Sequence, residues 1–342
     1  MSRLTDGRSL LMRSVVASVA TAAVALSPAA GRQAPRPGND AQRSTRSVLD
    51  TLDRVRSFHE TAMSPDGRRV AWVQDATGDA GTTTIYVRDV ASGESRRVTA
   101  AADGRAYKEN GVAWSSDSRT LAFLSDAASP DQRQVWVLDS EGGGAPHRLT
   151  SVIGQLAHPL WSPDGRQLAV LFVAGSTQET GTLVAYKPDT GVVGDVVEEQ
   201  RIAVVDPSSG NVREVSPPNL HVYDYDWSPD GQAFAAEAVE GSGTNNYWTA
   251  QLYIVRADNS ATRSIWRPPL QIAGPRWSPD GRSVDVIHGI MSDEGATGGD
   301  VYVVPAAGGV SVRPETVGAA GGVPANWHDE FHEPVRLRSG PR

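Results

Sequence analysis

One line recurs five times along this chain of 342 residues: an apolar segment, then Ser-Pro-Asp-Gly or a close variant, then a second apolar segment. We call the serine of each copy the marker serine, and the five are Ser64, Ser115, Ser162, Ser228 and Ser278. Successive marker serines lie 51, 47, 66 and 50 residues apart. A repeat of this period is typical of solenoids, propellers and arrays, so it constrains the fold more than any other feature.

Within each repeat, hydrophobic side chains alternate with polar ones, which is the period of a β-strand rather than of a helix. Val70 and Trp72 follow this alternation in the first repeat, and Ile85 and Val87 follow it in the next segment. Pro-Asp-Gly suits the turn between two strands, because proline presets φ, aspartate binds nearby backbone and glycine adopts positive φ without strain. The second copy reads Ser-Ser-Asp-Ser, so we expect a more strained turn, or one of another type, there.

Each repeat therefore predicts four antiparallel strands, and the chain predicts an all-β fold, a β-propeller with five recognisable blades over residues 47–342. Trp327 lies one further step of 50 residues beyond Trp277, so a sixth blade is expected to begin at about residue 324. We expect the propeller to be incomplete, because the sequence ends before that blade does. A sandwich or several small domains is the alternative, and the regular recurrence of the marker line disfavours it.

Two segments depart from the repeat. Between Val173 and Arg201 the third unit carries an insertion with its own candidate strand, and insertions of this sort lie on one face of a propeller. Ahead of the first marker line, residues Ser47 to Phe58 space their apolar side chains three and four apart. That spacing predicts a short helix at the edge of the domain.

The N-terminus has the three-part pattern of a secretory signal over residues 1–30: arginines, a small-residue apolar run and a small-residue cleavage site. The apolar run from Ser14 to Leu26 is shorter than the roughly 20 residues that a permanent membrane helix needs. Residues 31–46 are polar and rich in proline and arginine, which indicates a linker. These features predict a periplasmic or secreted bacterial protein, with an uncleaved anchor or a tail as the alternative.

Composition narrows the range of expected ligands and partners. The net charge of −8 makes nucleic acid an improbable ligand, and the chain has no cysteine for disulfides or thiolate sites. No segment after the signal region is apolar enough to cross a membrane. We expect no cofactor and no nucleic-acid partner.

The repeated lines resemble the N-terminal propeller of serine peptidases of the prolyl oligopeptidase family, especially the dipeptidyl-peptidase and acylaminoacyl-peptidase branches. WSPDGR-type and IYV-x-D lines are shared with TolB-type propellers, whereas three segments look like the peptidases. These are SVLDTLDRVRSFHETAMSPDG from Ser47, NNYWTAQLYIV from Asn245 and GIMSDEGATGGDVYVVPAAGG from Gly289. The resemblance covers residues 47 to 327, and it implies peptide substrates and a C-terminal α/β-hydrolase domain as partner.

In that family the catalytic serine sits in a Gly-x-Ser-x-Gly elbow on the hydrolase domain. This chain contains no such motif and no alternating strand–helix region. No catalytic residue can therefore be assigned, and we expect no activity from the chain alone. An independent enzyme that uses a propeller pocket is the weakest hypothesis, because no acid, base and nucleophile converge in the sequence.

Two loops are candidate substrate-binding sites. Asp293, Glu294 and Asp300 lie in an acidic, glycine-rich connection, where they are either solvated hairpin residues or carboxylates that attract the free amine of a peptide.

The second candidate loop places an aromatic pair beside amides. Its residues are Asn245, Asn246, Tyr247 and Trp248. Such a set can hold a peptide by stacking and hydrogen bonds, and the alternative is aromatic packing between blades.

Other polar residues are assigned to scaffold. His328 and His332 are four apart, but the position after the first holds Asp329 rather than the glutamate of a zinc peptidase, so no metal site is predicted. The marker aspartates recur with the fold and are expected to shape turns, and the tryptophans before the marker serines are expected to pack between blades.

Two functions remain. The first is a non-catalytic, substrate-gating propeller portion of a secreted peptidase whose hydrolase domain is absent from this chain. The second is a stand-alone TolB-like periplasmic propeller that binds protein or peptide partners.

Overall fold

The computed structural model describes residues 57–76, 81–141, 144–176, 199–241, 246–291, 297–309 and 313–315. They belong to one compact unit that begins at Arg56. Their regular structure consists of strands apart from one short 3-10 helix, η1 (Tyr247–Thr249). In these ranges no helix combines the length and apolar character that a membrane span requires.

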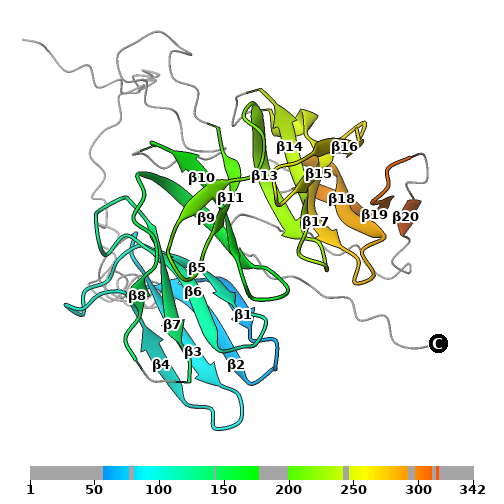
Figure 1. The fold of residues 1–342 in the computed structure, drawn as a ribbon. Helices are drawn as coiled ribbons and strands as arrows, with labels where there is room; N and C mark the ends of the chain where they lie inside the picture. Colours follow the sequence, from blue (N-terminus) through cyan, green and yellow to red (C-terminus); the bar gives the residue numbers. More distant parts are fainter. Residues whose placement is uncertain are drawn as a thin grey trace, which may run out of the picture. The chain divides into compact units, whose positions relative to one another are not determined.

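The strands form five four-stranded sheets, each an antiparallel meander in chain order, which we call blades 1 to 5 (Figure 1). Blade 1 consists of β1 (Phe58–Met63), β2 (Arg69–Asp75), β3 (Thr83–Asp89) and β4 (Ser95–Val98). Blade 2 consists of β5 (Glu109–Trp114), β6 (Thr120–Ser125), β7 (Gln134–Asp139) and β8 (His147–Arg148).

Blades 3 to 5 repeat the same order. Blade 3 consists of β9 (Gly154–Trp161), β10 (Leu168–Ala174), β11 (Arg201–Val205) and β12 (Val212–Glu214). Blade 4 consists of β13 (Leu220–Trp227), β14 (Ala233–Glu240), β15 (Gln251–Arg256) and β16 (Thr262–Trp266). Blade 5 consists of β17 (Gln271–Trp277), β18 (Ser283–Met291), β19 (Thr297–Pro305) and β20 (Arg313–Glu315).

These sheets confirm the predicted four-stranded repeat and its marker turns. The helix expected over residues 47–58 is wrong at its last residue, since Phe58 opens strand β1 and pairs with Gln74. The signal and linker regions, the rest of that segment, the candidate strand of the insertion, Trp327 and the histidine pair near the C-terminus lie outside the described residues.

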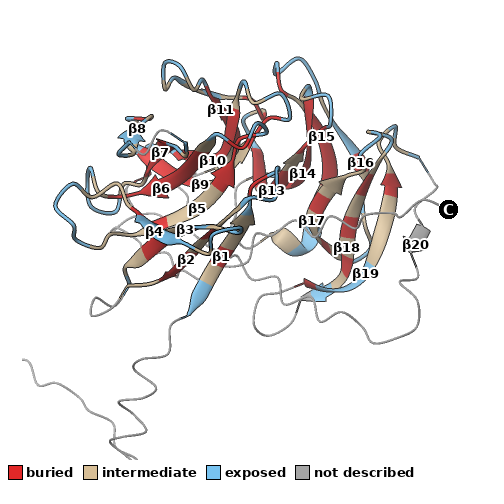
Figure 2. Cartoon of the chain, turned by 90° about the horizontal axis from the view of Figure 1, so that it is seen from below, coloured by how far each residue is buried: buried red, intermediate tan, exposed pale blue. Residues whose placement is uncertain are grey.

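In blades 2, 3 and 4 the second strand supplies core residues to both neighbouring blades. In β10, Leu168 and Val170 pack toward blade 2, while Ala169 and Leu171 pack toward blade 4. Successive side chains of a strand point to opposite faces, so a continuous apolar run serves two interfaces. Figure 2 shows this burial concentrated along the central strands, with exposure at the turns. Each pair of adjacent blades thus shares its own apolar cluster.

The marker tryptophans fasten one blade to the one before it. The indole Nε1 of Trp114 donates to the carbonyl of Ala62 at 3.0 Å, and that of Trp161 donates to Ala113 at 3.2 Å. In the next blade, Trp227 Nε1 donates to the carbonyl of Leu160 at 3.0 Å. Because each acceptor lies two residues before the preceding marker serine, the sequence repeat also repeats this cross-blade bond.

Every marker turn is built in the same way. In the first, Ser64 Oγ donates to Asp66 Oδ1 at 2.6 Å and accepts the Arg69 N–H at 2.9 Å. Gly67 donates its N–H to the Ser64 carbonyl at 2.8 Å with a φ of 71°. The marker aspartates are therefore turn residues, as predicted.

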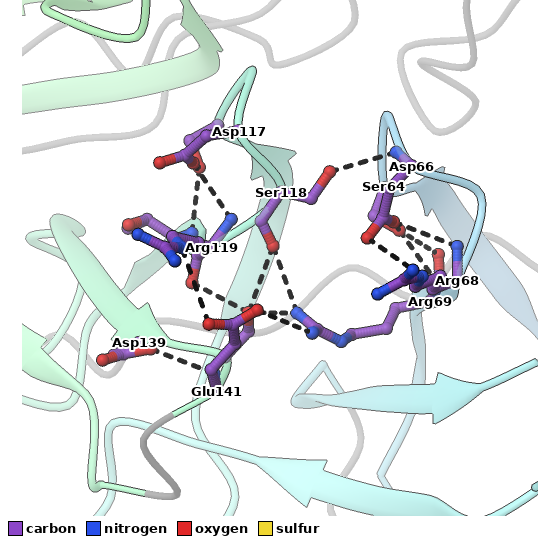
Figure 3. A network of polar contacts seen from close by, with 12 residues as sticks. Ser64, Asp66, Arg68, Arg69, Asp117, Ser118, Arg119, Asp139 and Glu141 are labelled. Atoms are coloured by element: carbon purple, nitrogen blue, oxygen red, sulfur yellow. Dashed lines mark hydrogen bonds and ion pairs between the residues drawn. The ribbon is translucent and has the colours of Figure 1, made fainter.

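The second turn keeps this geometry with serine in place of glycine, so the expectation of another turn type is wrong and that of a strained one is supported. Ser118 has a φ of 66°, which costs a residue with a Cβ about 1 kcal/mol. Its Oγ accepts the N–H of Asp66 from blade 1 at 3.0 Å, and its carbonyl accepts Arg69 Nη1 at 3.1 Å (Figure 3). These two hydrogen bonds between blades 1 and 2 offset the strain.

Candidate functional site

The aromatic loop lies between β14 and β15, where Tyr247 and Trp248 occupy η1. Tyr247 meets the ring of Trp248 edge-on at 5.2 Å and that of Tyr223 edge-on at 6.4 Å. The Asn246 carbonyl accepts the N–H and the hydroxyl of Thr249, both at 2.9 Å. Trp248 is 52% exposed, so packing between blades does not account for it.

The acidic loop belongs to another blade. The prediction that Asp300 belongs to this connection is wrong, since it is an exposed residue within β19 and pairs with His288 of β18 across the ladder. Its charge opposes the lowering of the His288 pKa, which burial causes. Asn245, Asp293 and Glu294 lie outside the described residues. The structure thus places the two predicted groups on neighbouring blades.

A further polar set, which the sequence analysis missed, lies on the first strand of each blade. The set occupies the residue four positions before each marker serine, and we call it the bulge position. Its members are Glu60, Gly111, His158, Asp224 and Gly274. The ladder between first and second strand shifts register at this residue in blades 2, 3 and 5 and at the residue before it in blades 1 and 4. Such bulges re-aim side chains and occur near functional sites.

His158 adopts a backbone conformation that its repeat equivalents give to glycine. Its φ is 47°, compared with 65° at Gly111 and 61° at Gly274. Its carbonyl accepts the hydroxyl of Tyr225 at 2.6 Å, and the two rings lie 4.9 Å apart. Because Tyr225 is fully buried in blade 4, a core residue of the next blade fixes the strained histidine.

Two bulge positions and an arginine form a charged chain across three blades. His158 Nδ1 lies 2.9 Å from Asp224 Oδ1, and both side chains are largely buried, at 10% and 15% exposure. The other oxygen of Asp224 lies 3.4 Å from Nη1 of Arg276 on blade 5. In chain order this makes an imidazole, a carboxylate and a guanidinium that join blades 3, 4 and 5.

Glu60 ties the first two blades. Its carboxylate accepts the backbone N–H groups of Gly111 at 2.7 Å and Val112 at 3.1 Å. Burial raises the pKa of Glu60, and these two bonds together with the charges of His158 and Arg133 oppose the rise.

Asp226 adds a second carboxylate to blade 4. Its Oδ2 accepts the backbone N–H of Trp277 at 2.8 Å. Burial raises the pKa of Asp226, with a smaller contribution in the same direction from Asp224. The charge of Arg276 and the Trp277 N–H oppose it.

Binding is the chemistry that this set suits. Carboxylates, an imidazole and a guanidinium can recognise the charged ends and the backbone of a peptide. In the described ranges no group of three or more histidine, aspartate or glutamate side chains is arranged to hold a metal ion.

A repeat-by-repeat alignment contains the signal that would have found the set. Positions that serve the scaffold hold the same or a chemically similar residue in the copies: the marker aspartates recur, and the core position six after the marker serine is always apolar. The bulge position instead reads Glu, Gly, His, Asp and Gly. Variation of charge at one fixed repeat position is what a site-specific role predicts.

No family model matches the chain. Among curated proteins it is 27% identical over 214 residues to the uncharacterized peptidase YuxL of Bacillus subtilis, covering 56% of this chain and 31% of that protein. It is 25% identical over 317 residues to dipeptidyl-peptidase 5 of Porphyromonas gingivalis, covering 79% of this chain and 42% of that protein. The chain therefore spans less than half the length of both relatives.

The sequence similarity to TolB proteins covers a shorter segment of the chain. A TolB homolog of Chlorobium chlorochromatii is 36% identical over 110 residues, covering 32% of this chain and 22% of that protein. The solved structure of a putative TolB from Agrobacterium tumefaciens superposes with a TM-score of 0.50 at 19% identity, covering 75% of this chain and 80% of that one.

A solved acylaminoacyl peptidase, in complex with a chloromethyl ketone, superposes with a TM-score of 0.51 at 13% identity. The superposition covers 40% of that chain and 77% of this one. At such identities the solved structures speak for the fold alone. Sequence and fold together show that the chain is a β-propeller region similar to that of prolyl oligopeptidase-type peptidases and built from TolB-type repeats.

Proposed function

We propose that the chain is the non-catalytic, substrate-gating propeller portion of a secreted or periplasmic serine peptidase that acts on short peptides. The observation that carries the proposal is the similarity to two peptidases over 56% and 79% of this chain, against 31% and 42% of those proteins. The larger remainder of such a protein is where a hydrolase domain belongs. Residues 1–30 are the proposed export signal.

The first strands supply the chemistry of the proposed gate. Glu60, Asp224 and Asp226 offer carboxylates to a peptide amine, while Arg276 offers a guanidinium to a carboxylate or carbonyl. Their cross-blade contacts hold these groups on rigid strands rather than on loops. In the proposed gate these groups line a passage that admits a short extended peptide and excludes a folded protein.

The aromatic loop is proposed as an outer contact for the same substrates. Trp248 presents an exposed ring beside Tyr247, and the Asn246 side chain adjoins them in sequence. Asn245, Asp293, Glu294 and Asp300 remain candidate contacts for the peptide amine. In the complete protein, W248A should weaken binding of long peptides more than that of dipeptides.

The first test uses the chain alone with chromogenic dipeptide and acyl-amino-acid substrates. We expect no turnover, because the chain has no Gly-x-Ser-x-Gly motif. Turnover that a serine-directed inhibitor abolishes would contradict the non-catalytic assignment.

The second test reads the genomic DNA downstream of the codon for Arg342. An open frame with Gly-x-Ser-x-Gly followed by aspartate and histidine supports the peptidase proposal. In that complete protein, R276A should lower the preference for dipeptides over long peptides, measured as a ratio of kcat/KM values. An unchanged ratio counts against the gate.

The TolB-like alternative rests on the 36% identity to the Chlorobium homolog. If the downstream DNA holds a stop codon and no hydrolase sequence, the chain is better described as a stand-alone propeller that binds protein or peptide partners. Crosslinking of the exported chain in cells, followed by identification of one reproducible partner, would then support this role.

A further inference from the structure

Adjacent blades meet through the same two surfaces each time. We call the side of a blade toward the preceding blade its leading face, and the side toward the following blade its trailing face. In blade 3, Leu168 and Val170 lie on the leading face, and Ala169 and Leu171 lie on the trailing face. Each of the four apolar clusters joins one trailing face to the next leading face. Within the described ranges, the leading face of blade 1 and the trailing face of blade 5 belong to no such cluster.

One position of the repeat distinguishes the trailing face of blade 5. Blade 5 has the half-buried Asp285 seven residues after its marker serine, with Val303 opposite it in the ladder. Its other ladder neighbour, Arg276, extends its guanidinium to Asp224 of blade 4. Blades 1 to 4 have a fully buried alanine at the same position, namely Ala71, Ala122, Ala169 and Ala235. The trailing face of blade 5 thus carries a carboxylate where the other four carry a methyl group.

The leading face of blade 1 departs from the repeat with the opposite charge. On its third strand, Arg88 is exposed and lies opposite Val70 in the ladder. The residue at the same ladder position in blades 2 to 5 is aliphatic and buried, namely Leu138, Val205, Val255 and Val304. The first and last described sheets therefore differ from the inner ones by one charge each, and the two charges are complementary.

The surroundings of Arg88 are otherwise those of a surface between blades. Trp72 and Tyr86 are neighbours on the same face and stack with ring centroids 5.3 Å apart. Met63 lies opposite Val70 on the first strand and is 60% exposed. A broad apolar face with one cation at its margin suits an apolar partner that carries one anion.

The surroundings of Asp285 fit that description. Ile287, Val301 and Val303 share its face of blade 5, and all three are half-buried. Their counterparts in blade 3 are buried under the next blade, namely Leu171, Ile202 and Val204. The apolar side chains of this face therefore remain in part accessible, as those of blade 1 do.

We propose that the trailing face of blade 5 docks on the leading face of blade 1 in a second copy of this chain, with Asp285 beside Arg88 of the second copy. The contact repeats the one that joins every adjacent pair of blades, and the carboxylate–guanidinium pair selects these two faces. Within one chain, the described strands of blades 1 and 5 do not pack on each other as adjacent blades do. A two-fold symmetric pair of copies uses both faces of both chains.

Sedimentation velocity of the full chain over a range of concentrations tests the proposal. We expect the mass to rise from one chain to two with concentration. R88E and D285K should each weaken this association at least about 10-fold, because like charges then face each other. The double variant R88E/D285K reverses both charges and should associate as the parent does. R166E is the matched control, since Arg166 is an exposed marker-turn residue of blade 3 and the change in charge is the same.

Circular dichroism and urea midpoints establish that each variant is folded before sedimentation. A single-chain mass at every concentration would overturn the proposal, and it is the result expected if blade 1 closes on blade 5 within one chain. An assembly that R88E leaves intact, or that the double variant does not restore, would overturn it as well. The contact does not rest on the proposed gating function, and no hydrolysis is measured, so its failure leaves the peptidase assignment unaffected.

Discussion

The interface between blades 3 and 4 and the interface between blades 4 and 5 share the same marker line in the sequence, yet different contacts stabilise them. In the first, Trp227 bonds the Leu160 carbonyl, and Tyr225 and Phe234 are fully buried. In the second, the Trp277 indole lacks an acceptor among the described residues and a cavity of about 510 Å³ adjoins it. The marker line fixes the turn and the strand, while residues outside it decide how two blades adhere.

The difference is also one of charge. The apolar cluster between blades 3 and 4 has fully or nearly fully buried rings, such as Tyr225 and Phe234, whereas the buried members of the one between blades 4 and 5 are aliphatic and its rings are only partly buried. Asp226 and Glu237 then add buried carboxylates to blade 4. A polar, less filled interface is the place where a ligand or a relative movement of blades costs least.

The largest predicted effect is a core truncation that breaks the apolar interface. Phe234 packs with ring centroids 4.0 Å from Trp227 and 5.5 Å from Tyr225. F234A should lower the free energy of unfolding by about 3–5 kcal/mol in urea titrations. V284A, at the same repeat position in blade 5, should cost only about 1–2 kcal/mol, since it removes fewer atoms next to a looser interface. Equal losses would remove the distinction.

The next effect concerns acid stability at the interface between blades 3 and 4. Burial lowers the pKa of His221 to about 4, and its Nδ1 accepts the N–H of Gln200 at 3.2 Å. The unfolded state takes up a proton near pH 6.5 while the folded state stays neutral, so stability falls as the pH drops from about 6.5 to 4. Across this pH range the free energy of unfolding should fall by about 3 kcal/mol.

H221Q removes this titration and should flatten the pH dependence of the urea midpoint over that window. H147Q is the control, because His147 is an exposed residue of β8. A slope that H147Q changes as much as H221Q does would count against burial as the cause.

A smaller effect of opposite sign is expected between blades 4 and 5. Burial raises the pKa of Asp226, so its contribution to stability is full below the unfolded pKa and is lost as the pH rises through the folded pKa. D226N keeps an oxygen acceptor for the Trp277 N–H and cannot ionise. It should exceed the parent in stability by about 1 kcal/mol at pH 8 and lose this advantage at pH 3. An advantage independent of pH would contradict the mechanism.

The fold was readable from the sequence because its determinants repeat. The marker turn, the alternation of Leu168 to Leu171 and the cross-blade tryptophans each follow from one copy and apply to the next. Ser118 shows the limit of this approach: the sequence left a strained turn and another turn type open, because the bond to Asp66 that holds the strained turn comes from another blade. Such a contact between distant residues has no local signature.

The candidate site was harder to predict from the sequence for the same reason. Attention to unusual loops identified Tyr247 and Trp248, but the charged bulge positions are single residues inside ordinary strands. His158 and Asp224 meet only because blades 3 and 4 stack. The cavity beside Trp277 was hidden by a marker line identical to that of blade 4, since the change lies in its partner, Asp226.

Substitution of phenylalanine for the marker tryptophans tests most directly whether the fourth one, Trp277, is held differently. W227F removes an indole N–H bonded at 3.0 Å and should lower the free energy of unfolding by about 1–2 kcal/mol. W277F removes a buried donor without an acceptor in the described structure, so it should leave the free energy of unfolding unchanged or raise it by up to about 1 kcal/mol, measured by urea titration. A loss for W277F as large as that for W227F would contradict the account.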